Sequence, residues 1–403
     1  MKNLLILFVL FIFLSNTYCF ADDNLDLESL EESDFSEVYS TSNTEPVINS
    51  KNVIVIDRKS LSVLYEKNSY EKTAMASTTK IMTCIIALEN CSLTETVKIS
   101  NKAASVSGST LGLIANMSMS LNDLLYGLML RSGNDCAIAI AEHISGSVEN
   151  FSHLMNQKAI ELELKNTNFV TPHGLDDPNH YTTAYDLAIL TNYALNNNKF
   201  KTIVSTKNIS ISFNGYPRNI SNTNELLGNL EGVYGVKTGF TFEAGRCLVS
   251  ACKRNNLDII IVVLGADTKK IRTSDSTKLI SYIFNNYKYI DISSIINESF
   301  NNYISYFNNN YLLEKTTTKP ILKLEELSNY EFPLSNSDSL HLSTKVFTFN
   351  KFNSSVIKNS KVGELYLYKN KTLLCKVNII IENQLEKNNW IYYFKNIVFN
   401  FYK

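Results

Sequence analysis

Ser77 and Lys80 stand three residues apart, in an S-x-x-K pattern in which the lysine could activate the serine. The run from Ser77 to Glu89 has the composition of a helix, and this spacing puts both side chains on one face. A serine hydroxyl is a weak nucleophile until a base takes its proton, and lysine can act as that base only when its pKa is lowered. The same pattern recurs at Ser69 and Ser355. Ser77 is favoured because a helix start stabilises negative charge on the hydroxyl.

Two further short motifs follow along the chain. Ser132 and Asn134 offer a second hydroxyl for proton relay and an amide that can hold a substrate. Lys237, Thr238 and Gly239 offer a cation and a hydroxyl on an expected strand, with a glycine that lets a ligand backbone approach closely. Each motif is weak alone, and the three in this order form a specific set.

The elements around these motifs predict an α+β domain over residues 49–288, with an antiparallel sheet and helices. Strands are expected at 53–56 and 61–65, which form a hairpin, and at 233–238, 247–251 and 259–264. Helices are expected at 77–89, 122–130, 135–144, 151–164, 183–195 and 274–287. Asn122 or Asp123 is the expected cap of the second helix, and Thr183 with Asp186 resembles a capping box.

The remainder of the chain changes character after Asp291. Asn-rich segments with expected strands at 345–349, 364–368 and 373–381 predict a small all-β domain over 289–386. A final segment, 387–403, is expected to associate with a membrane surface. Read as a helix from Trp390, it is too short for a bilayer core of ~30 Å. One side of this helix would carry the apolar residues Trp390, Phe394, Ile397, Val398 and Phe401. The polar residues Lys395, Asn396, Asn400 and Lys403 would lie largely elsewhere. The alternative is a last β-strand.

The N-terminus predicts export. Lys2 precedes an unbroken apolar run from Leu4 to Leu14, and Cys19-Phe20-Ala21 resembles a cleavage site. The run is shorter than the roughly 20 residues that span a bilayer, which favours a signal peptide over 1–21 rather than a retained anchor. Residues 22–48 are rich in acidic side chains and predict a disordered leader.

Composition limits the partners and cofactors. The formal net charge of −1 gives no bulk attraction to nucleic acid. The chain has 7 cysteines but no C-x-x-C pair, so a zinc knuckle is not expected, and most of them fall in apolar runs as small buried hydrophobes. We therefore expect no metal and no cofactor.

Longer segments around the motifs resemble the low-molecular-weight penicillin-binding proteins, the D-alanyl-D-alanine carboxypeptidases. The resemblance rests on the stretches 76–83, 130–135 and 169–186 and, most closely, on Gly235-Val236-Lys237-Thr238-Gly239-Phe240-Thr241 with Ala244-Gly245. Ordered S-x-x-K, S-x-N and K-T-G motifs are typical of penicillin-binding proteins and class A β-lactamases. The resemblance covers about residues 50 to 385. It implies a secreted serine peptidase of the cell wall, with peptidoglycan stem peptides as substrates and β-lactams as covalent inhibitors.

The resemblance also implies roles for individual residues. Ser77 would be the nucleophile and Lys80 its general base, with Ser132 and Asn134 beside them. Lys237, Thr238 and Gly239 would bind the terminal carboxylate of the substrate. The backbone N–H groups of Ser77 and Phe240 would form the oxyanion hole. Arg272 matches a family arginine that helps to fix the carboxylate.

Three alternative functions stay open. A class A-like β-lactamase needs a glutamate in an E-x-x-L-N segment, and the nearest match, Glu161 to Lys165, ends in lysine. A peptidoglycan D,D-endopeptidase would use the same serine machinery. A catalytically inactive wall-binding protein is disfavoured because all three motifs are complete. His173 and His180 are expected to be structural.

Overall fold

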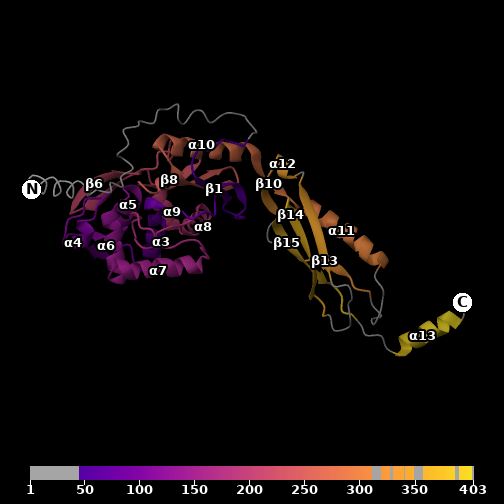
Figure 1. Cartoon of the computed structure of the whole chain (residues 1–403). Coiled ribbons are helices and arrows are strands. Elements are labelled where there is room, and N and C mark those ends of the chain that lie inside the picture. Colours follow the sequence, from indigo (N-terminus) through magenta and orange to yellow (C-terminus); the bar gives the residue numbers. More distant parts are fainter. Residues whose placement is uncertain are drawn as a thin grey trace, which may run out of the picture. The chain divides into compact units, whose positions relative to one another are not determined.

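The computed structural model describes residues 45–310, 319–326, 330–339, 341–348, 357–385 and 390–401 (Figure 1). The expected signal peptide and residues 22–44 of the expected leader lie outside the described residues. The chain divides into two compact units, Met1–Asn285 and Asn286–Lys403.

The first unit is built on a five-stranded antiparallel sheet in the order β2-β1-β9-β8-β7. Its strands are β1 (Asn52–Asp57), β2 (Val63–Lys67), β7 (Val233–Thr241), β8 (Gly245–Arg254) and β9 (Leu257–Ala266). β1 is buried along its whole length because elements cover both faces of the sheet. Figure 1 shows α10 (Lys269–Asn286) on one side of this sheet and the other helices on the opposite side.

The helical layer contains the expected helices in their expected order, together with two that were not expected. It contains the 3₁₀ helix η2 (Ala76–Thr79) and the helices α3 (Lys80–Asn90), α4 (Asn101–Ala104), α5 (Leu121–Leu130), α6 (Asn134–Ser145), α7 (Val148–Glu161), α8 (Ala184–Leu195) and α9 (Asn198–Ser205). The two unexpected helices are α4 and α9. Gly146 ends α6 in a left-handed conformation, with φ 78°. Two small two-stranded sheets, β3 (Thr96–Lys98) with β4 (Ser118–Ser120) and β5 (Asn208–Phe213) with β6 (Tyr216–Ser221), were not expected from the sequence.

One helix cap and one capping box differ from the expectation. Ser120, rather than Asn122 or Asp123, caps α5, because its side chain accepts the backbone N–H of Asp123. Thr183 caps α8 as expected. The Asp186 carboxylate, however, accepts from the Asn166 backbone N–H instead of closing a capping box.

The second unit is a β structure with one long helix that the sequence analysis did not predict. A four-stranded antiparallel sheet has the order β11-β15-β14-β13, and β10 pairs with β12. The strands are β10 (Tyr287–Asp291), β11 (Leu322–Leu324), β12 (Glu331–Ser335), β13 (Leu342–Thr348), β14 (Lys361–Lys369) and β15 (Thr372–Ile381). Helix α11 (Ser293–Asn310) contacts β13 and β14 and buries Ile296 and Phe307. A short helix, α12 (Asn336–Ser339), follows β12.

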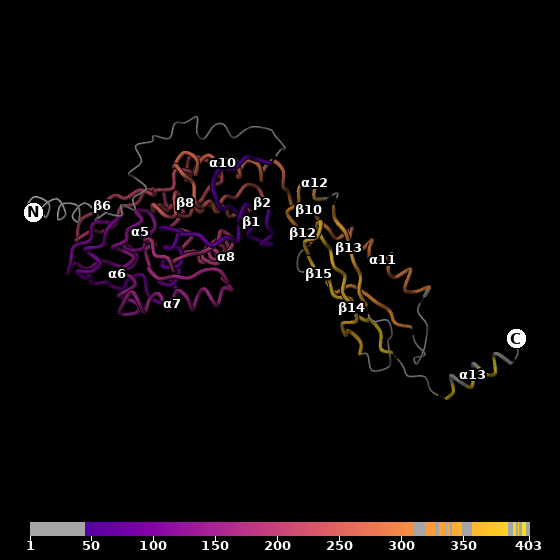
Figure 2. The backbone as a smooth tube through the Cα atoms, viewed as in Figure 1, coloured from indigo at the N-terminus to yellow at the C-terminus, as the bar shows by residue number. Residues whose placement is uncertain are grey.

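The chain ends in a helix rather than a strand. α13 spans Trp390–Phe401 and appears as the last coil of the tube in Figure 2. Among the helices of the described residues, none combines the length and apolarity needed to cross a bilayer.

Candidate active site

Ser77 and Lys80 lie at the junction of η2 and α3. Ser77 is the second residue of η2, and Lys80 is the first residue of α3. The Lys80 Nζ atom lies 2.7 Å from the Ser77 Oγ atom. Both side chains are buried, and Lys80 has no exposed surface. The expected pair therefore forms, with the amine in direct contact with the hydroxyl.

Two further oxygens surround the Lys80 amine. It donates to the Asn134 side-chain oxygen at 2.8 Å and to the His173 backbone oxygen at 2.7 Å. Neither acceptor has a proton to give. A neutral amine has two N–H bonds and one lone pair, so these two oxygens take both N–H bonds and leave the lone pair for the Ser77 O–H. This arrangement suits a lysine that accepts a proton from serine.

The electrostatic environment favours the neutral form of Lys80. Burial is the largest effect that lowers its pKa well below the ordinary value, and the positive charge of Lys237 lowers it further. Asp135 and Cys136 act weakly in the opposite direction. The Asp135 carboxylate is occupied by backbone N–H groups of Leu111, Gly112 and Leu113.

The segment from Ser132 to Asn134 leads into α6. Ser132 is buried and adopts a left-handed backbone conformation with φ 58°. Asn134 is held at both ends: its backbone N–H donates to the Ser109 carbonyl and its Nδ2 donates to the Ser107 carbonyl, each at 2.8 Å. Its side-chain oxygen is thereby directed at Lys80.

Strand β7 brings the third motif to the same place. Lys237 and Thr238 are buried, and the Thr238 hydroxyl lies 2.7 Å from the Thr223 hydroxyl. A methyl group on Gly239 would lie 3.1 Å from both the Ala76 Cβ and the Ser77 backbone nitrogen. The glycine therefore makes room for the turn that carries the nucleophile, which differs from the ligand approach expected from the sequence.

Phe240 and Arg272 contact other residues of the first unit. Phe240 follows Gly239 on β7, and the Arg246 guanidinium lies 3.6 Å from the centre of its ring. Arg272 lies on α10, fully buried, and its Nη2 donates to both carboxylate oxygens of Glu225 at 2.8 and 2.9 Å. Glu225 is two residues after Thr223, whose hydroxyl contacts Thr238 on β7. Arg272 therefore holds the segment 223–225 beside β7. The substrate contact expected for Arg272 stays a prediction.

The loop that contains His173 and His180 supports both Lys80 and η2, a role that the sequence motifs did not indicate. Besides the carbonyl that His173 offers to Lys80, Gly174 packs so closely on η2 that a methyl group there would lie 1.9 Å from the Ala76 oxygen. The His180 Nδ1 accepts the Val170 N–H, so its Nε2 donates to the Thr79 hydroxyl at 2.8 Å. Burial lowers the pKa of His180 to about 4, which keeps the ring neutral at physiological pH. Both histidines have structural positions, as expected.

This geometry provides a buried serine, an amine of lowered pKa in contact with it and a second lysine whose charge acts on that amine, which suits nucleophilic acyl transfer. Residues 39–268 match the protein family described as D-alanyl-D-alanine carboxypeptidase. The chain belongs to this family. Both the match and the arrangement of its serine and lysine agree with the resemblance noted from the motifs, and the α+β fold expected for this family is confirmed.

Curated relatives carry the same description. The chain is 32% identical over 362 residues to the D-alanyl-D-alanine carboxypeptidase DacF of Bacillus subtilis, covering 86% of this chain and 88% of that protein. It is 38% identical over 257 residues to the D-alanyl-D-alanine carboxypeptidase DacA of Haemophilus influenzae, covering 61% of this chain and 64% of that protein.

Two solved structures are similar to different extents of this chain. Penicillin binding protein 5 of Haemophilus influenzae is similar with a TM-score of 0.67 and 28% identity, over 85% of this chain and 99% of that chain. The DD-transpeptidase of Streptomyces K15 is similar with a TM-score of 0.57 and 32% identity, over 59% of this chain and 98% of that chain.

Proposed function

We propose that this chain is a serine carboxypeptidase that removes the terminal D-alanine from peptidoglycan stem pentapeptides, through an acyl-enzyme on Ser77. The observation that carries the proposal is the Lys80 amine, which lies 2.7 Å from the Ser77 hydroxyl and has both of its N–H bonds directed at fixed oxygens. A lysine so placed removes the serine proton without first having to turn away from another acceptor.

The reaction proceeds in two halves. Ser77 Oγ attacks the carbonyl carbon of the penultimate D-alanine while Lys80 takes the hydroxyl proton. The C–N bond then breaks, and the leaving D-alanine amine takes up a proton, with the Ser132 hydroxyl as the relay. In the second half, water attacks the ester and gives a proton to Lys80. The ester C–O bond then breaks, Lys80 returns the proton to Ser77 Oγ, and the tetrapeptide is released.

Binding and charge stabilisation fall to strand β7. Lys237 and Thr238 bind the terminal carboxylate of the substrate, because a buried ammonium group and a hydroxyl complement that anion. The backbone N–H groups of Ser77 and Phe240 stabilise the oxyanion. A β-lactam presents a strained amide and a carboxylate to the same groups and acylates Ser77, so penicillins are covalent inhibitors.

The β-lactamase alternative lacks support at the position of its glutamate. Glu161 is paired with Lys158 at 2.7 Å, and its side chain is 62% exposed at the end of α7. A carboxylate in this position is engaged at the surface rather than beside the buried Ser77. Rapid hydrolysis of the acyl-enzyme by that glutamate is therefore not part of the proposal.

The proposed reaction is tested by product analysis with defined muropeptides. Incubation of a pentapeptide should yield free D-alanine and a tetrapeptide with a new carboxylate. Cleavage of a cross-linked dimer without D-alanine release would assign the chain to the endopeptidases. A product in which an added amine replaces water would assign it to the transpeptidases, and a Ser77→Ala variant provides the blank.

We further propose that the chain acts outside the cytoplasm and is held on the outer face of the cytoplasmic membrane by α13. The support is a set of large apolar side chains exposed along this short helix. Trp390 is 74% exposed and Phe394 59% exposed, and Ile391, Ile397, Val398 and Phe399 are also exposed. A lipid interface accepts aromatic and aliphatic side chains of this kind.

A further inference from the structure

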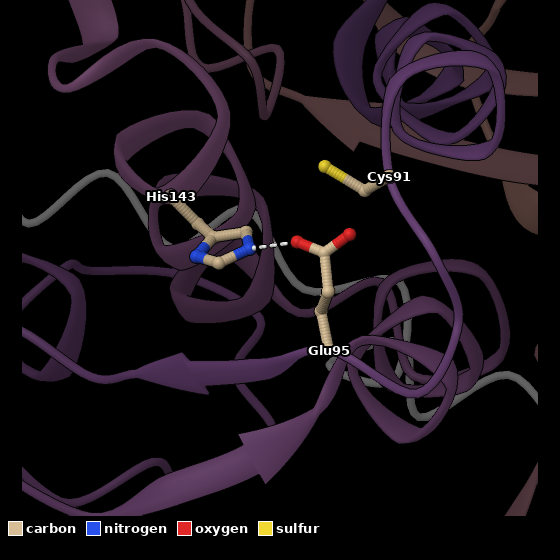
Figure 3. A group of neighbouring side chains, drawn as sticks. All are labelled: Cys91, Glu95 and His143. Carbon is tan, nitrogen blue, oxygen red and sulfur yellow. Dashed lines mark hydrogen bonds and ion pairs between the residues drawn. The ribbon is translucent and has the colours of Figure 1, made fainter.

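A second group of reactive side chains lies away from Ser77. Cys91, Glu95 and His143 each direct one donor atom toward the others, and the three atoms all lie within 4.8 Å of one another. The His143 Nε2 lies 2.9 Å from a Glu95 carboxylate oxygen, and Figure 3 shows the Cys91 sulfur pointing toward both groups. Sulfur, nitrogen and carboxylate oxygen are the three donor types that zinc uses in proteins.

The surrounding backbone holds two of these donors in a short turn. Cys91 follows the last residue of α3, where its N–H donates to the Ala87 carbonyl. Glu95 N–H donates to the Ser92 carbonyl, and the Ser92 N–H in turn donates to one Glu95 carboxylate oxygen at 2.6 Å. That bond leaves the second carboxylate oxygen facing His143. Donors placed by fixed backbone cost little conformational entropy when a metal binds.

The third donor arrives on another helix. His143 lies in the last turn of α6, so the ends of α3 and α6 meet at the cluster. A helix C-terminus carries partial negative charge from its unpaired carbonyl groups and favours a cation. Two such ends at one place add to the charge of the carboxylate and, once it loses its proton, of the thiol.

We propose that Cys91, Glu95 and His143 bind one Zn²⁺ ion. Water fills the fourth tetrahedral position, since all three side chains retain access to solvent. On binding, the Cys91 thiol releases its proton to solvent, and the thiolate and carboxylate charges balance the charge of the ion. Zinc is preferred to Ca²⁺ or Mg²⁺, because those hard cations take oxygen ligands.

The zinc site ties together helices that begin in the active site. Lys80 starts α3 and Asn134 starts α6. At ~1.5 Å per residue, Cys91 lies about 16 Å along α3 from Lys80, and His143 about 14 Å along α6 from Asn134. The ion is therefore remote from the reaction. It connects the helix that begins at Lys80 to the helix that begins at Asn134.

The binding test uses the full chain, reduced, stripped of metal with a chelator and then freed of the chelator. Zinc added in competition with a chromophoric indicator should bind at one equivalent, and Ca²⁺ in excess should not displace it. Cobalt should give an intense near-ultraviolet band from thiolate ligation. Zinc at 100 times its dissociation constant should raise the melting temperature by roughly 5 °C.

Matched variants decide whether these three residues are the ligands. Cys91→Ser and His143→Gln should each weaken zinc binding by more than about 100-fold, beyond the loss typical of residues outside the ligand set. Cys375→Ser, at another partly buried cysteine, and His153→Gln, at an exposed histidine, should bind as the unaltered chain does. Acylation by penicillin verifies that each variant is folded. No zinc uptake, no thiolate band with cobalt, or equal uptake by Cys91→Ser and Cys375→Ser would overturn the proposal.

Discussion

Gly239 and Ser77 face each other across the junction of β7 and η2, with only 3.1 Å between the Ser77 backbone nitrogen and the position that a side chain at Gly239 would take. The contact joins the last residue of one motif to the first residue of another. It also means that the position of Ser77 depends on β7 as well as on its own helix.

Replacing Gly239 with alanine should therefore move η2 by a few tenths of an ångström. A displacement of 1 Å at a reacting group costs about 10²-fold in rate, so we expect acylation of Gly239→Ala by penicillin to be roughly 10-fold slower, with the fold intact. Stopped-flow acylation rates measure this. Gly215→Asn is the control, because nothing lies within 4 Å of that position and asparagine accepts its left-handed backbone. An unchanged rate in Gly239→Ala would contradict the role of the contact.

Ser77→Ala should abolish the covalent adduct with penicillin, since the attacking oxygen is removed. Intact-protein mass spectrometry reads the adduct directly. Ser69→Ala is the matched control: Ser69 heads another S-x-x-K pattern but its hydroxyl donates to Glu66. An adduct that persists in Ser77→Ala, or disappears in Ser69→Ala, would remove Ser77 from the mechanism.

Lys80→Arg should keep the positive charge and lose the reaction. Arginine cannot give up its proton, so the variant has a cation where a base is required. We expect penicillin acylation to fall by about 10²–10⁴-fold, the contribution typical of general acid–base catalysis. The rate of adduct formation and circular dichroism of the same sample separate lost chemistry from lost folding. Substantial acylation by this variant would refute Lys80 as the base.

The pH dependence should reveal the coupling between the two lysines. Lys80 is active when neutral, so acylation rises with pH through its pKa. Because the charge of Lys237 helps to lower that pKa, Lys237→Gln should shift the acidic limb of the rate profile to higher pH, whatever happens to its height. Profiles of acylation rate against pH for the two proteins test this. Superimposable limbs after scaling would show that Lys237 has no effect on the titration.

Deleting residues 390–403 should release active enzyme from the membrane fraction. Six large apolar side chains are exposed on α13, and a lipid interface would shield them from water. Without α13, the enzyme loses this attachment. Cell fractionation with penicillin labelling locates the active protein. A variant with Trp390 and Phe394 changed to serine serves as a milder test in the full-length chain. Membrane association that survives both changes would count against α13 as the attachment.

The sequence predicted the parts of the site that depend on residue type. Ser77, Lys80 and Asn134 carry chemistry that a search for nucleophiles and their partners can recognise, and the structure brings them within hydrogen-bonding distance. The His173 carbonyl could not be found in this way. Every residue has a backbone oxygen, and only the packing of Gly174 against η2 makes this one face Lys80.

Other misses have equally specific reasons. Helix α11 is rich in asparagine, which favours turns, but its apolar residues Ile296, Phe300 and Phe307 pack into the core of the second unit and outweigh that preference. The approach of His143 to Glu95 spans 48 residues of sequence and depends on where α6 ends relative to the turn after α3. A search for short motifs such as C-x-x-C finds only residues that are close in sequence, so it cannot detect this contact.

The order of strands in the first sheet has a consequence for how the enzyme is made. β1 pairs with β9, joining Asn52 to Leu264. β1 is therefore synthesised long before the strand with which it pairs. Lys237 lies on β7, so its charge can lower the pKa of Lys80 only once β7 has joined that sheet. An unfinished polypeptide that ends before β7 therefore contains Ser77 and Lys80 but not Lys237 and Thr238. We expect the nascent chain to stay inert toward peptides and antibiotics alike until β7 is in place.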